Sequence, residues 1–116
     1  MDSFNAVSMN WIVLIVAGLF EVAFASCLEK ARISTGNAVY WWYTGFFVSI
    51  VISMLLLMKA IQTLPIGTAY AVWTGIGAVG TVLVGIFIFK EPISFWKIFF
   101  IITLIGSIVG LKAVAH

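Results

Sequence analysis

The sequence is poor in the residue types that build disulfide scaffolds and metal centres. It has one cysteine, one histidine and two prolines among 116 residues. A single cysteine cannot form an internal disulfide or a thiolate metal cage, and the single histidine, His116, cannot supply a site with several histidine ligands. We therefore expect no disulfide framework, no metal and no other cofactor.

Charged residues are equally scarce. Lysine and arginine number 6, aspartate and glutamate number 4, and the net charge is +2. So small a net charge argues against binding nucleic acid. Soluble domains carry about 25% charged residues, whereas this chain carries 9%, too little for a water-exposed surface. The sequence also offers no nucleophile–base pair or metal cluster, so we do not expect an enzyme.

Apolar residues fill the chain instead, at 64% of the sequence and with a mean hydropathy of +1.23. Four stretches are long enough to cross a bilayer core as helices, which takes about 20 residues each. They are residues 10–28, 38–58, 66–89 and 93–111. Membrane strands are about half as long and alternate strictly. The sequence thus predicts an all-α integral membrane protein, residues 1–116 forming a single domain of four transmembrane helices.

Four helices leave little room for a polar pathway through their own centre, and no repeat relates the two halves of the chain. We therefore expect function to need a dimer. Gly106 and Gly110 in the last stretch form a GxxxG pattern, which lets two helix backbones approach closely. The pattern favours these glycines as a dimer contact.

Glu21 is the most informative residue, because it lies inside the first apolar stretch. An acidic residue there costs about 2.5–3.5 kcal/mol on insertion scales. A carboxyl group in that place holds either a proton or a cation, and this competition is what proton-coupled exchange requires. The alternative is a protonated glutamate that only hydrogen-bonds a neighbouring helix. No lysine or arginine inside the stretches is placed to pair with Glu21, which favours a function.

Other candidate residues are ambiguous by themselves. Gly18 shares a face with Glu21 and leaves space beside it, although close helix packing explains a small residue equally well. Tyr70 offers a hydroxyl, and Trp73 offers an indole N–H and a ring face that attracts cations; both types also pack in cores. Ser53 is expected either to serve the site or to bond the carbonyl one turn earlier in its own helix.

Two motifs together resemble the small multidrug resistance family, and most closely its guanidinium-exporter branch. They are the glutamate inside the first stretch and the string PIGTAYAVWTGIGAVGT at residues 65–81. F-E-V from Phe20, K-E-P in the third loop and G-L-K ending at Lys112 extend the likeness over almost the whole chain. The resemblance implies an antiparallel, dual-topology dimer in the bacterial inner membrane that exports guanidinium or small substituted guanidinium ions in exchange for protons.

The resemblance also implies a role for each matching residue. Two copies of Glu21 would share one central site and carry the protons or the cation. Ser53 would hydrogen-bond that glutamate, and Gly18 would pack closely beside it. Tyr70 and Trp73 would line and gate the site. A planar guanidinium ion has paired N–H donors that suit the two oxygens of a carboxylate.

Phe24 departs from the branch, which usually has a tryptophan three residues after the glutamate. Phenylalanine at position 24 has no N–H to hydrogen-bond Glu21. The binding site would then be held less tightly and would admit quaternary ammonium compounds. The first loop also departs, with Glu29 where a lysine is common, and relatives that work as pairs of dissimilar subunits diverge in the same region. Two alternatives stay open: efflux of quaternary ammonium compounds, and a heterodimeric or non-transporting partner subunit.

Overall fold

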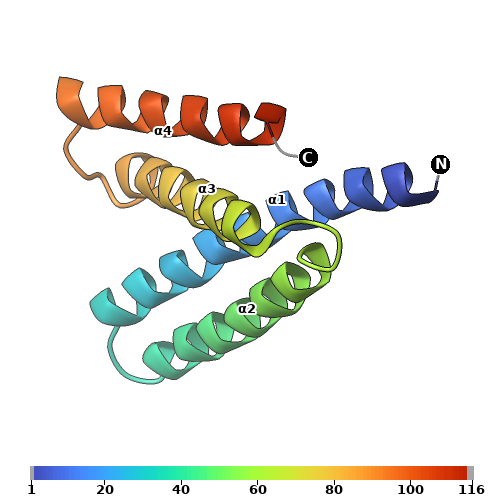
Figure 1. Cartoon of the computed structure of the whole chain (residues 1–116). Helices are drawn as coiled ribbons and strands as arrows, with labels where there is room; N and C mark the ends of the chain where they lie inside the picture. The colour runs from blue at the N-terminus through green and yellow to red at the C-terminus, as the bar shows by residue number, and fades with distance from the viewer. Residues whose placement is uncertain (1, 115–116) are drawn as a thin grey trace.

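Four long helices joined by short connections make up the protein (Figure 1). The computed structural model describes the backbone of residues 2–114 and the side chains of residues 5–114; His116 lies outside the described residues. The helices are α1 (Asp2–Ile33), α2 (Ala38–Ala60), α3 (Ile66–Phe87) and α4 (Phe95–Val114). Each contains a span long and apolar enough to cross a membrane. The prediction of four membrane-length helices is confirmed.

Helix α1 is longer at both ends than the apolar stretch at residues 10–28. Hydropathy marks where apolar residues stop, whereas helical hydrogen bonding continues through polar ones. Beyond residue 28, the Arg32 guanidinium donates two hydrogen bonds to the Glu29 carboxylate one turn earlier. Such a pair stabilises an exposed helical turn, so α1 continues to Ile33.

The connection between α3 and α4 is also longer than the sequence suggests, since the expected stretches were 66–89 and 93–111. Lys90 has φ 60°, a left-handed conformation that cannot continue a right-handed helix. The Glu91 amide donates to the Gly85 carbonyl at 2.9 Å and closes the turn. Ser94 then caps α4, because its hydroxyl oxygen accepts the Lys97 amide at 3.1 Å.

The helices form a thin slab that measures 52 × 35 × 18 Å along its principal axes. Helix α2 runs back along α1, α3 crosses α1, and α4 lies along α3 (Figure 1). The start of α1 and the end of α4 lie at the end of the slab that holds the α2–α3 connection, and the other two connections lie at the opposite end. This is the arrangement that four successive membrane crossings produce.

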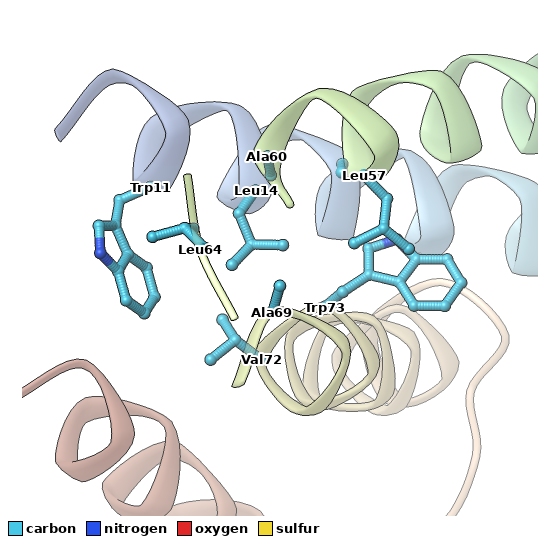
Figure 2. Close-up of a cluster of buried hydrophobic side chains, with 9 residues drawn as sticks. Trp11, Leu14, Leu57, Ala60, Leu64, Ala69, Val72 and Trp73 are labelled. Carbon is cyan, nitrogen blue, oxygen red and sulfur yellow. The ribbon is translucent and has the colours of Figure 1, made fainter. Parts of the chain in front are cut away.

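The buried core joins the first three helices and includes a residue of the α2–α3 connection (Figure 2). Its members are Trp11, Leu14 and Ala17 of α1, Leu57 and Ala60 of α2, Leu64 of the connection, and Ala69, Val72 and Trp73 of α3. Helix α4, by contrast, has no buried residue within the described chain. Its apolar surface is suited to lipid or to another helix rather than to water.

Candidate functional site

Glu21 lies in the middle of α1, where this helix packs against α3. Its Oε2 atom is buried and has no hydrogen-bond partner among the side chains and backbone described for residues 2–114. Buried polar atoms in folded proteins almost always have a partner. A proton neutralises a carboxyl group in this state, whereas a cation pairs with its ionised form.

Gly77 of α3 provides the space that the Glu21 side chain occupies. A Cβ atom at position 77 would overlap the carboxyl carbon and both oxygens of Glu21. Two more glycines bring the helices together in the same way. A Cβ on Gly18 would lie 2.6 Å from Cγ2 of Ile76, and one on Gly80 would overlap Val22. Gly18 therefore does lie in the close α1–α3 contact beside Glu21.

A buried chain of two hydrogen bonds links the first three helices. The Trp73 indole N–H donates to the Ser53 hydroxyl at 2.9 Å, and that hydroxyl donates to the Ala17 carbonyl at 2.7 Å. Ser53 is fully buried and Trp73 is nearly so. Ala17 precedes Glu21 by one turn, and its carbonyl is the regular helical acceptor for the Glu21 amide.

The structure corrects both expectations for the Ser53 hydroxyl. Its proton points to the Ala17 carbonyl, so it does not donate to Glu21 in this structure. The bond back to its own helix is not formed either, because Ala17 belongs to α1. The reason is the close packing of α1 and α2 at a small residue, Ala17, which has no exposed surface. A carbonyl of the neighbouring helix is then within reach of the hydroxyl.

Two aromatic residues adjoin this group. Tyr70 is exposed, and its ring centre lies 5.6 Å from that of Trp73. Phe24, one turn after Glu21, is half-buried and meets Phe46 of α2 edge-on, with ring centres 5.8 Å apart. The Phe24 ring is thus engaged with α2 and brings no hydrogen-bond donor to the carboxyl group.

The chain, including Glu21, matches the model of a known protein family. The family model described as Small Multidrug Resistance protein matches residues 9–105. The chain belongs to this family. The resemblance carried by Glu21 and by residues 65–81 is confirmed, and the four membrane-length helices are those of a multi-pass membrane protein.

Relatives in the small multidrug resistance family cover nearly the whole chain. A probable guanidinium efflux system subunit from Bacillus licheniformis is 43% identical over 107 residues, which are 92% of this chain and 100% of the relative. A guanidinium exporter from Salmonella typhimurium is 42% identical over 108 residues, 93% of this chain and 100% of the relative. A guanidinium exporter from Citrobacter freundii is 40% identical over 111 residues, with the same two coverages.

The glycines of α4 differ from those of the α1–α3 contact. A Cβ atom on Gly106 or Gly110 would meet no atom within 4 Å beyond the neighbouring backbone of α4, among the described residues. The α3–α4 contact uses Gly75 instead, where a Cβ would lie 2.8 Å from Cδ1 of Ile108. In this small multidrug resistance protein, Gly106 and Gly110 therefore lie on a side of α4 that its own chain leaves open.

A cavity of mixed lining at the end of the slab with the α1–α2 connection was not foreseen. It has a volume of about 400 Å³. Its polar lining comprises Ser26, Glu29, Arg32, Tyr43, Thr81 and Glu91. No spacing in the sequence places residues of α1, α2, α3 and the last connection together. Glu29 and Arg32 reach the cavity because α1 continues beyond residue 28, and the hydropathy of the sequence does not indicate this continuation.

Proposed function

We propose that this protein exports guanidinium or small substituted guanidinium ions in exchange for protons, with Glu21 as the exchange group. Two observations support the proposal. A relative named as a probable guanidinium efflux system subunit matches 92% of the chain, and one named as a guanidinium exporter matches 93%. Glu21 also holds a buried oxygen that no described residue satisfies. The second observation carries the mechanism, because a buried carboxyl oxygen without a partner among the described residues is available to a proton or to a cation.

The surroundings of Glu21 suit a planar cation. A guanidinium ion presents parallel N–H donors that pair with the two oxygens of a carboxylate. The Trp73 N–H is already donated to Ser53, so it does not compete with a cation for the Glu21 carboxylate. Gly18 brings α1 close to α3 at Ile76, and Tyr70 and Phe24 supply aromatic edges and faces near this group.

Exchange follows from the chemistry of a shared carboxylate. A carboxyl group that holds a proton is neutral and no longer attracts a cation, so the proton and guanidinium exclude each other. In a dimer, two Glu21 side chains at one site alternate between two protons and one cation. The Trp73–Ser53–Ala17 chain ties α1 to its neighbours one turn below Glu21, which holds the carboxyl group at the crossing in both states.

We propose an antiparallel dimer in the bacterial inner membrane, with the chain inserted in both orientations. A slab only 18 Å thick encloses little by itself, and α4 has no buried residue within the described chain. Gly106 and Gly110 on the open side of α4 would let a second copy approach closely. The named relatives are all bacterial.

Two alternative functions, a heteromeric subunit and an exporter of quaternary ammonium compounds, each have specific support. The Bacillus licheniformis relative is named as a subunit of an efflux system, which favours pairing of this chain with a dissimilar subunit. Phe24 brings no N–H to Glu21 and leaves a less polar site, which favours quaternary ammonium compounds as substrates.

Reconstitution of the purified protein into liposomes tests these assignments together. We expect a proton-coupled current when guanidinium is added, a much smaller one with tetramethylammonium, and none with Glu21→Gln. Equal currents for both cations would favour multidrug efflux. Current that arises only after a related subunit is added would favour the heteromeric assignment, and its absence in every case would contradict transport.

A further inference from the structure

We propose that Gly77 is a positioning residue for Glu21, and that the space at position 77 sets the length of the acid that fits there. The inference rests on the proposed function, since it concerns how the exchange group is held. The carboxyl group of Glu21 occupies the volume that a side chain at position 77 would fill. Any larger residue at 77 must therefore displace the carboxyl group or move α3 away from α1.

Gly77 is distinct among the three glycines of the α1–α3 contact. Gly18 faces Ile76 and Gly80 faces Val22, so a new Cβ at either position meets hydrocarbon. At position 77 it meets Cδ and both carboxyl oxygens of Glu21, and one of these oxygens is buried. A side chain at any of the three positions would clash with the neighbouring helix. Of the three, only at Gly77 is the clashing group the Glu21 carboxyl.

A second explanation for Gly77 is flexibility, because glycine weakens a helix and favours a bend in α3. The two explanations differ in their response to a shorter acid at position 21. Aspartate lacks one methylene, so its carboxyl group is drawn back toward α1 and leaves room for a Cβ at 77. If flexibility matters instead, alanine stiffens α3 whatever acid lies opposite.

The decisive measurement is guanidinium affinity for the wild type, Gly77→Ala, Glu21→Asp and the double variant, by calorimetry of the purified dimer at alkaline pH. We expect Gly77→Ala to weaken binding roughly tenfold or more, as for contacting residues with strong coupling. Glu21→Asp should weaken it less, and the double variant should bind more tightly than Gly77→Ala alone. Independent, additive losses would overturn the proposal.

Gly80 provides the matched control, since it lies on the same helix and crowds α1 at Val22. We expect Gly80→Ala to lower thermal stability with a small effect on affinity. Val22→Ala should restore that stability and Glu21→Asp should not. Rescue of Gly80→Ala by Glu21→Asp would mean that the shorter acid loosens the whole contact, and the specific role of Gly77 would be rejected.

A second readout does not depend on guanidinium. An apolar carbodiimide modifies protonated carboxyl groups in membranes, and mass spectrometry locates the adduct, with Glu21→Gln as the blank. We expect Gly77→Ala to speed modification of Glu21 several-fold, because the carboxyl group loses its cover on α3. An unchanged rate would overturn the proposal. If the wild type binds no guanidinium while labelling responds as expected, the proposed function fails and the positioning role stands.

Discussion

The indole N–H of Trp73 on α3 donates a 2.9 Å hydrogen bond to the hydroxyl of Ser53 on α2. The same hydroxyl donates to the Ala17 carbonyl on α1, so one serine joins three helices. A buried donor that loses its acceptor costs more than the bond itself contributes. The contact therefore connects the stability of the fold to the turn that carries Glu21.

Replacing Ser53 by alanine should destabilise the protein, because the Trp73 N–H loses its acceptor and the Ala17 carbonyl loses a donor. We expect a loss of about 1–2 kcal/mol, the range of interhelical hydrogen bonds in model membrane peptides. Denaturation in detergent measures it, together with guanidinium affinity and its pH dependence. Ser49→Ala, one turn earlier on α2, is the control. Equal stabilities of the two variants would contradict the importance of this chain.

Replacing Glu21 by glutamine should abolish guanidinium binding and substrate-driven proton release while the protein still folds. Glutamine keeps the shape and removes the charge. In the wild type, binding should weaken as the pH falls, because protonation neutralises the carboxylate that holds the cation. Calorimetry at several pH values measures both effects. Proton flux driven by substrate in Glu21→Gln would refute the mechanism.

Replacing Gly106 or Gly110 by leucine should weaken the dimer before it unfolds the monomer. The new side chains enter space that the chain itself leaves open, and they push a second helix away. Native mass spectrometry or cross-linking in detergent reports the dimer fraction. Val109→Leu, an exposed position next to Gly110, is the control for added bulk. A dimer fraction unchanged in all variants would locate the interface elsewhere.

Replacing Phe24 by tryptophan should favour guanidinium over its bulkier substituted forms. An indole N–H that reaches Glu21 adds a hydrogen bond to a charged group, about 1.5–3 kcal/mol or more than tenfold in affinity. The larger ring must also displace Phe46, which meets Phe24 edge-on. Competition binding with alkylated guanidinium ions measures the ranking. Phe47→Trp, at an exposed neighbour, should leave the ranking unchanged.

The sequence predicted the helices well and the contacts between them poorly. Apolar runs of membrane length determine where helices form, and Glu21 is recognisable because a charge is rare in such a run. Hydropathy does not detect a helix that continues through Glu29 and Arg32, so α1 was expected to end too early. Partners across helices depend on register and crossing geometry, which the pattern along one helix does not encode.

Ser53 illustrates this limit. Its bond to the Ala17 carbonyl arises because α1 and α2 approach at a residue with a small side chain. Gly77 illustrates it too, since a glycine in a helix has several uses, and only the position of Glu21 opposite it distinguishes space for a carboxyl group from a bend.

The exposed α4 has a consequence for how such a gene can diversify. The buried contacts around Glu21 come from α1, α2 and α3, whereas the last helix has no buried residue within the described chain. In the proposed dimer, substitutions on the open side of α4 would alter which chain it pairs with and leave the contacts around Glu21 in place. After a gene duplication, two copies are then free to change their pairing preferences while each inherits the same chemistry.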